Sequence, residues 1–121
     1  MPQVEFSIEQ EDINQVRVIH INGYLDAHTF QKLDDVIMDV FNDGIYKLAI
    51  NLENVNYISS AGAGVFIGAH GPARENNGDI ILVNPTEGVM RIFELLGITQ
   101  LFTITRNINE AVAKFAVVNL P

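Results

Sequence analysis

The 121-residue sequence contains no cysteine and no tryptophan, and it has only three serines. The absence of cysteine excludes disulfide bonds and cysteine-based metal sites. No apolar run reaches the length of about 18 residues that a membrane-spanning helix needs. The first residues form neither a basic segment nor an apolar signal core, so no secretory signal is expected. These absences predict a cytoplasmic protein without a membrane partner.

Positive charge is also scarce, because seven lysines and arginines stand against fifteen aspartates and glutamates, for a net charge of −8. The seven cations are scattered along the chain and form no basic stripe that could neutralise phosphates. Direct binding to nucleic acid is therefore not expected, and anionic membranes would repel the acidic surface. Such a surface favours a partner with a basic docking face, although solubility accounts for the charge equally well.

Apolar residues make up 48% and charged residues 18% of the chain, which is typical of a globular fold. The length suits one domain spanning residues 1–121. Alternating or continuous apolar runs predict five strands, at residues 4–8, 16–21, 46–52, 78–83 and 101–104. Helical periodicity predicts four helices, at residues 26–43, 60–76, 86–97 and 109–117.

The order of these elements predicts an α/β fold. Strands that alternate with helices form parallel β-α-β units on one sheet, and a hairpin turn near residues 12–14 joins the first two strands. Asn22 and Gly23 are expected to end the second strand. The run at residues 46–52 is apolar on both faces for much of its length, which is typical of a central parallel strand.

The second predicted helix opens with small residues, including Gly62 and Gly64. Their spacing departs from the dinucleotide-binding fingerprint, and no Gly-Lys-Ser/Thr sequence forms a P-loop. The glycines let the helix pack closely on the sheet, or keep its surface flat so that a partner's backbone can approach. A Gly-Pro pair at residues 71–72 predicts a kink or an interruption of this helix near His70.

Two of the three serines, Ser59 and Ser60, lie between a predicted strand and this helix. One serine there is usually an N-cap, whose oxygen accepts a backbone N–H. Two serines exceed what capping requires, and the positive field of a helix N-terminus would tolerate a phosphate. That phosphate would add about −1.5 to −2 charges to a small neutral surface and expel a tightly packed partner. We therefore interpret the pair as a phosphorylatable contact point.

Asp26 follows the second predicted strand and is most simply an N-cap or first-turn acid of the first helix. It could also lie beside Ser60, because ligand sites gather at the C-terminal ends of parallel strands. His28 and Thr29 are its neighbours in the sequence. The histidines are dispersed, and neither a nucleophile elbow nor a metal-binding spacing occurs. We therefore expect no catalytic residue, cofactor or metal, and a protein that is not an enzyme.

One further pattern extends over most of the chain, at residues 23–26, 50–65, 78–80 and 89–97. These segments resemble STAS domains, and in particular bacterial anti-sigma-factor antagonists. The core of the resemblance is a strand, an apolar-Ser-Ser element and a Gly-x-Gly-Val sequence at residues 62–65. The resemblance implies a single STAS-like domain, with a mixed, mostly parallel sheet, an N-terminal hairpin and four to five helices.

The resemblance also implies a partner switch. An unphosphorylated antagonist of this family binds an anti-sigma factor, which is a serine kinase of the histidine-kinase-like ATPase type, and thereby frees the sigma factor. The kinase phosphorylates a serine at the start of the second helix, and a PP2C-type serine phosphatase reverses this. Matching the motif places the phosphoacceptor on Ser60. Ser59, which stands where the family often has aspartate, is the alternate acceptor.

The implied partner-binding surface surrounds that serine. Its residues are Asp26, His28, Thr29, Ser59, Ser60, Ala61, Gly62 and Gly64. Two alternatives stay open. The same strand-end surface could belong to a STAS-type sensor that binds a nucleotide or another ligand. The domain could also be a scaffold in a signalling pathway without a sigma factor, in which both serines are only caps.

Overall fold

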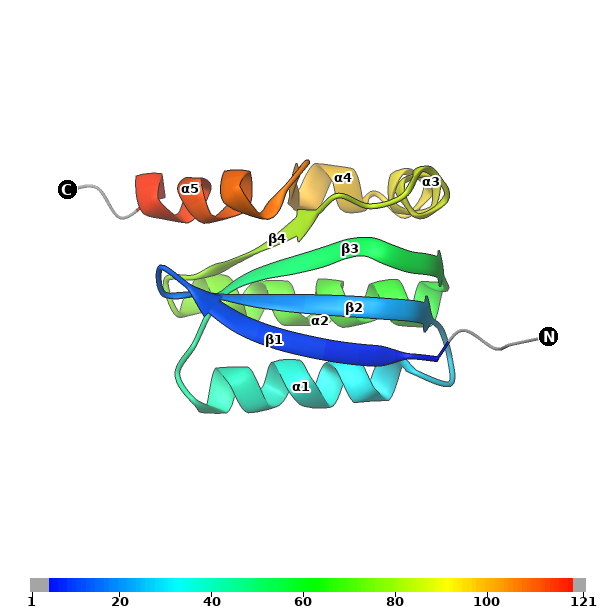
Figure 1. The fold of residues 1–121 in the computed structure, drawn as a ribbon, viewed down its shortest axis with the longest axis horizontal. Coiled ribbons are helices and arrows are strands. Elements are labelled where there is room, and N and C mark those ends of the chain that lie inside the picture. The colour runs from blue at the N-terminus through cyan, green and yellow to red at the C-terminus, as the bar shows by residue number, and fades with distance from the viewer. Residues whose placement is uncertain (1–4, 119–121) are drawn as a thin grey trace.

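The computed structural model describes residues 5–118, and a five-stranded sheet forms its centre (Figure 1). The strands lie side by side in chain order. β1 (Ser7–Ile13) is antiparallel to β2 (Val16–Leu25), and β3 (Lys47–Ile58), β4 (Asp79–Val83) and β5 (Thr103–Thr105) continue parallel to β2. The predicted α/β fold, with a mixed, mostly parallel sheet and an N-terminal hairpin, is confirmed.

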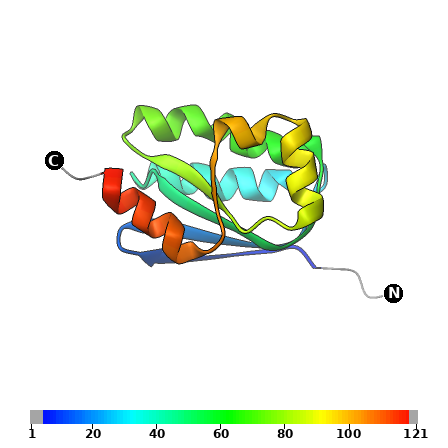
Figure 2. The same ribbon diagram turned by 90° about the horizontal axis from the view of Figure 1, so that it is seen from above.

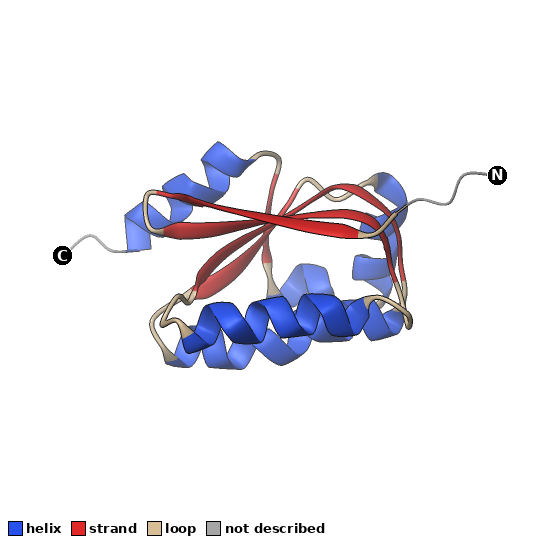
Figure 3. Ribbon diagram, turned by 60° about the horizontal axis from the view of Figure 1, so that its bottom comes forward, coloured by secondary structure: helices blue, strands red, loops and turns tan. Residues whose placement is uncertain are grey.

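Helices cover both faces of this sheet. They are α1 (Phe30–Asn42), α2 (Ser60–Glu75), α3 (Glu87–Leu95), α4 (Ile98–Leu101) and α5 (Ile108–Val118). α1 and α2 lie side by side on one face, and α5 crosses the other (Figures 1 and 3). Seen from above, α3 closes one end of the sheet (Figure 2). Within residues 5–118, no helix is long and apolar enough to cross a membrane.

The short helix α4 was not predicted, because a single helical turn carries too little periodicity to be recognised. It includes Leu101, so the last strand begins at Thr103 and not at residue 101 as predicted. The helix before it agrees better with the prediction. Thr86 caps α3 by accepting the N–H of Val89 at 3.3 Å, and Gly97 takes the left-handed conformation that ends such helices, with φ of 76°.

The sheet separates two apolar cores. Leu48 and Ile50 of β3 pack with α1, α2 and α3, whereas Ala49 between them packs with α5. In the larger core, Phe66 of α2 meets Phe93 of α3 edge to face, with ring centroids 6.3 Å apart. Burying one such side chain contributes about 1.5–3 kcal/mol. The predicted burial of β3 on both faces is therefore confirmed over this part of the strand.

β2 and β3 are longer than predicted. The sequence Asn22-Gly23 does not end β2, because the ladder shifts register on either side of this pair and then continues to Leu25 and Ile58. Gly23 makes the irregularity possible, since its φ of 104° is a conformation that other residues rarely adopt. The extra pairing carries both strands to the end of the sheet where α1 and α2 begin.

The β1–β2 turn lies further along the chain than predicted. Asp12 and Ile13 still belong to β1, and Asn14 and Gln15 form the turn with left-handed φ values of 50° and 68°. The guanidinium of Arg17 donates to both carboxylate oxygens of Asp12, which holds this end of the ladder. The predicted first strand, at residues 4–8, was therefore placed too early. Its residue 4 lies outside the described residues.

β1 is one edge of the sheet, and the three-residue strand β5 is the other. Glu9 and Glu11 are exposed on β1. The Glu11 carboxylate lies 2.6 Å from Nε2 of His20, whose Nδ1 lies 2.9 Å from the amide nitrogen of Asn51. Polar side chains thus cover the part of the sheet face next to this edge.

α2 runs without a break from Ser60 to Glu75 although it contains Pro72. The interruption expected near His70 is therefore wrong. Proline disfavours a helical conformation in the preceding residue because its ring clashes with that residue's N–H and Cβ. The preceding residue here is Gly71, which has no Cβ, so the clash is reduced and the helix continues into its last turn.

Candidate functional site

The C-terminal ends of β2 and β3 lie next to each other, at the end where α1 and α2 begin (Figure 1). The N–H of Ser59 donates to the backbone oxygen of Leu25 at 2.9 Å, which ties the start of α2 to the end of β2. We call this region, residues 24–29 and 57–64, the serine end. The structure thus brings the segment around Asp26 and the two adjacent serines to one end of the molecule.

The two serines differ in their surroundings. Ser59 is the N-cap of α2, since its Oγ accepts the N–H of Gly62 at 3.2 Å and its backbone oxygen accepts the N–H of Ala63 at 2.9 Å. Its side chain is half-buried. Ser60 is exposed, and its hydroxyl has no hydrogen-bond partner among the described residues. Capping therefore engages one serine and leaves the other accessible.

The two glycines at the start of α2 also differ. Gly62 is buried, and a Cβ there would lie 2.5 Å from the backbone oxygen of Leu25 and 2.8 Å from its Cγ. Gly62 therefore allows α2 to pack against β2, and it faces Leu25 rather than a partner. Gly64 is exposed, and a Cβ there would meet nothing within 4 Å. Gly64 and Ala61 are therefore the small, exposed residues at the start of α2, and no bulky side chain projects from the helix surface at these two positions.

Asp26 does not cap α1 as predicted. Its backbone oxygen accepts the N–H groups of Thr29 and Phe30, at 3.2 and 2.9 Å, and its carboxylate accepts the N–H of His28 at 2.9 Å. The Thr29 hydroxyl donates to the backbone oxygen of Tyr24 at 2.6 Å. These contacts fix a turn, so α1 begins at Phe30, four residues later than predicted. Asp26 and Thr29 support the loop beside the serines, while the His28 side chain is exposed.

Sequence reasoning missed two exposed tyrosines at the serine end. Tyr24 and Tyr57 are 45% and 52% exposed, and their rings meet edge to face with centroids 6.3 Å apart. Each precedes a buried residue, Leu25 or Ile58, so strict alternation along the strands could have placed both rings outward. Tyrosines are enriched among the residues that dominate binding energy at interfaces. The pair therefore enlarges the surface that a partner can contact.

The first turn of α2, residues 60–63, contains no charged side chain. A helix N-terminus has unpaired backbone N–H groups and the equivalent of roughly +0.5 elementary charge. A phosphate on Ser60 would lie in this favourable field. It would find no lysine or arginine in the turn to neutralise it, so its charge would remain at the surface. No group of three metal-ligating side chains occurs within residues 5–118.

Comparison with known proteins identifies a family. The sequence model of the STAS domain matches residues 7–111 of this chain. One curated relative is the anti-sigma-B factor antagonist of Staphylococcus aureus (strain NCTC 8325 / PS 47). It is 27% identical over 101 residues, which span 84% of this chain and 94% of that protein.

Solved structures share the fold. A candidate anti-sigma factor antagonist from Thermotoga maritima superposes with a TM-score of 0.86 at 23% identity, over 90% of this chain and 94% of that one. The anti-sigma factor antagonist SpoIIAA in its unphosphorylated form superposes with a TM-score of 0.79 at 21% identity. The match covers 92% of this chain and 97% of that one. The phosphorylated form of SpoIIAA, a Bacillus cell fate determinant, has a TM-score of 0.69 at 22% identity. The match covers 91% of this chain and 98% of that one.

Proposed function

Because the chain belongs to the STAS domain family, we propose that it is an anti-sigma factor antagonist acting in a phosphorylation-controlled partner switch. One observation carries the proposal: Ser59 caps α2, whereas Ser60 beside it is exposed. The relative named as an anti-sigma-B factor antagonist supports it, as do the two forms of SpoIIAA, unphosphorylated and phosphorylated.

In this proposal the partner is an anti-sigma factor that is also a serine kinase of the histidine-kinase-like ATPase type. It docks on the serine end of the unphosphorylated chain, in the bacterial cytoplasm. A partner with a basic docking face suits the net charge of −8. The proposed contact residues are Tyr24, Asp26, His28, Thr29, Tyr57, Ser59, Ser60, Ala61 and Gly64.

Phosphorylation of Ser60 then releases the partner. The modification adds about −1.5 to −2 charges at a position whose neighbours in the chain, Ser59 and Ala61, are uncharged. A packed partner would have to bury that charge without a counter-ion in the first turn of α2, which is costly. A PP2C-type serine phosphatase restores the contact surface. The chain is the substrate of both enzymes and catalyses neither step.

The proposal predicts the behaviour of two variants at position 60. Ser60→Ala removes only the acceptor oxygen, so it should bind the kinase as the parent does and receive no phosphate. Ser60→Asp places a carboxylate at the interface, so its affinity for the kinase should fall by at least about tenfold, or 1.4 kcal/mol. Surface plasmon resonance with the kinase measures both affinities. Mass spectrometry after incubation with kinase and Mg-ATP locates the phosphate.

Ser59→Ala is the matched control, since it removes the cap and leaves Ser60 in place. It should still be phosphorylated, although the fold should lose about 0.5–2 kcal/mol. Phosphate found on Ser59 alone would overturn the assignment of Ser60. Equal kinase affinity of Ser60→Asp and the parent would instead favour the scaffold hypothesis, in which neither serine regulates binding.

A further inference from the structure

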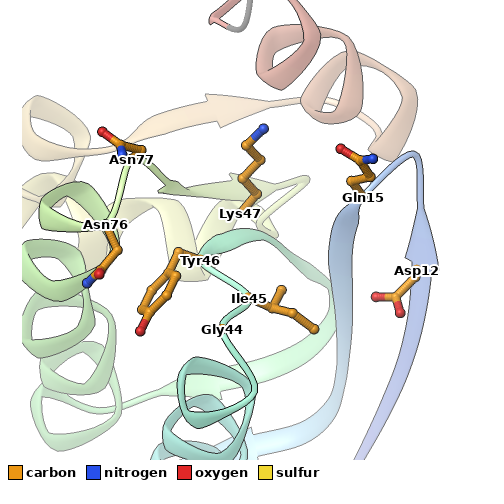
Figure 4. Close-up of a pocket in the computed structure, with 8 residues that line it drawn as sticks. All are labelled: Asp12, Gln15, Gly44, Ile45, Tyr46, Lys47, Asn76 and Asn77. Atoms are coloured by element: carbon orange, nitrogen blue, oxygen red, sulfur yellow. The ribbon is translucent and has the colours of Figure 1, made fainter.

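A cavity of about 650 Å³ lies at the end of the sheet opposite the serine end (Figure 4). Three connections form its walls: the β1–β2 turn, the segment between α1 and β3, and the segment between α2 and β4. Figure 4 shows side chains from all three around one opening. The proposed partner switch uses none of them.

Lys47, the first residue of β3, supplies the positive charge of this cavity. It is half-buried and makes no ion pair with another described residue. The cations that do form ion pairs with acids are Arg17, Arg74 and Arg91. The remaining cations, which are Lys32, Arg106 and Lys114, are exposed. Lys47 is thus the partly buried cation among the described residues that has no acidic partner.

The acidic residue that lines the cavity, Asp12, is already engaged. Both carboxylate oxygens of Asp12 accept hydrogen bonds from Arg17, and these bonds hold the pKa of Asp12 below its ordinary value. This ion pair adds no net charge to the cavity, so the charge of Lys47 is not cancelled there. Lys47 therefore supplies a charge that no acid lining the cavity cancels.

Three amide side chains line the cavity with Lys47, those of Gln15, Asn76 and Asn77. The Asn76 amide already donates to the backbone oxygen of Pro72, and the other two amides come from residues in the left-handed conformation. In the view of Figure 4 the Lys47 ammonium lies between the side chains of Gln15 and Asn77. Their φ values are 68° and 63°. Asparagine tolerates this region, but glutamine does so poorly, and a two-residue hairpin turn favours glycine there. Glutamine at residue 15 costs stability and places a hydrogen-bonding amide at the cavity.

An apolar surface completes the cavity. Ile45 and Tyr46 are partly buried against the larger core, and both line the opening. The Tyr46 ring stacks on Phe41, with centroids 5.1 Å apart, so its position is fixed by packing. A site with one cation, two amides that have no partner elsewhere among the described residues, a third amide bound to Pro72 and an apolar wall suits a ligand that has an anionic head and an apolar body.

We propose that this cavity binds a small organic anion. Its carboxylate or phosphate contacts the Lys47 ammonium and accepts hydrogen bonds from the amides of Gln15 and Asn77. Its apolar body lies against Ile45 and Tyr46. The site is at the N-terminal end of β3 and so is separate from the strand ends that carry the serines. Binding there needs neither Ser60 nor the kinase.

The test is a titration of the uniformly ¹⁵N-labelled chain followed by amide chemical shifts. Benzoate and phenyl phosphate are the probes, and neutral benzamide, acetate and inorganic phosphate are the comparison compounds. Benzoate or phenyl phosphate should shift the amides of residues 15, 47 and 77 in a saturable way, and the tighter of the two identifies the preferred head group. Benzamide, which lacks the charge, and acetate, which lacks the ring, should bind more weakly.

Two variants distinguish a built site from general attraction. Lys47→Met keeps an unbranched side chain close to the length of the lysine stem, without its ammonium, and should weaken the binding by about tenfold or more. Lys32→Met, at an exposed lysine of α1, should leave the binding unchanged. Shifts that do not saturate at tens of millimolar probe, or that respond equally to both variants, would overturn the proposal.

Gln15→Gly provides a readout that a purely structural role would not give. Glycine relieves the left-handed backbone, so the melting temperature should rise, while loss of the amide should weaken binding of the same probe. A variant that is more stable and still binds as tightly as the parent would remove Gln15 from the site. A variant that melts at a lower temperature would contradict backbone strain at Gln15.

Discussion

Gly62 and Gly64 lie two residues apart in α2, yet a methyl group would meet different surroundings at each. The position of a Cβ on Gly62 is only 2.5 Å from the backbone oxygen of Leu25, which cannot move without shifting the end of β2. The same atom on Gly64 would project into open space. The first glycine thus maintains the geometry of the serine end, and the second affects only its outer surface.

Alanine at each position should therefore change stability in opposite directions. Gly62→Ala should lower the free energy of unfolding by about 1–3 kcal/mol, because the added methyl overpacks the contact with Leu25. Gly64→Ala should raise it by up to about 1 kcal/mol, because alanine favours the helix. Urea unfolding monitored by circular dichroism compares the two. A loss of stability in both variants would show that the outer surface at Gly64 is not open.

The sequence predicted where the serine pair lies but left the roles of the two serines to a family resemblance. Serine is preferred as an N-cap at either position. The N-cap is the residue whose own φ and ψ are not helical, directly before the first helical residue. The φ and ψ of Ser59, at −98° and 170°, give the cap to this residue. Adjacent candidates of one residue type cannot be separated by composition or periodicity.

At the level of elements, the ion pair between Asp12 and Arg17 makes the stability of the β1–β2 hairpin depend on pH. Hydrogen bonds from Arg17 lower the pKa of Asp12 in the folded chain. A lowered carboxylate pKa stabilises the fold at every pH above the ordinary value, 3.8, and that stabilisation disappears as pH falls through the lower folded value. Because the Asp12 side chain is 59% exposed, water screens the pair and its contribution is small.

Asp12→Asn should accordingly lower the free energy of unfolding at neutral pH by less than about 1 kcal/mol. The difference between variant and parent should shrink as the pH is brought below 3.8. Urea unfolding at several pH values measures this difference, because urea adds no salt that would screen the ion pair. The other carboxylates are the same in both proteins, so their effect cancels in the comparison. A difference that stays constant down to the lowest pH would exclude the ion pair as its cause.

Sequence reasoning succeeded where an element is specified by its own residues. The cap at Thr86 and the glycine at residue 97 delimit α3, and amphipathic periodicity predicts α5 within one residue at each end. It failed where contacts distant in sequence decide. β2 extends past Gly23, and β3 past Val55, because each strand has the other as a neighbour. The continuation of α2 through Pro72 has a local cause instead, since the residue before the proline is a glycine.

At the scale of the whole molecule, the fold places two kinds of surface at opposite ends of β3. Its last residues lead into the serine end, and its first residue, Lys47, lies in the cavity. The fold class was predictable because alternating strands and helices allow few arrangements. The cavity was not, since it joins three connections that are far apart in the sequence and Lys47 alone has no recognisable motif.

The position of β1 at the edge of the sheet has a consequence for the protein in solution. An edge strand exposes backbone groups that can pair with another chain, and charged side chains oppose such pairing. Glu9 and Glu11 supply that charge on β1, whereas the charge of Asp12 is paired with Arg17. Removing that charge should therefore promote pairing between chains. Glu9→Gln combined with Glu11→Gln should self-associate at neutral pH, seen as light scattering that rises with protein concentration while the circular dichroism is still native. Scattering no greater than that of the parent would contradict this protective role.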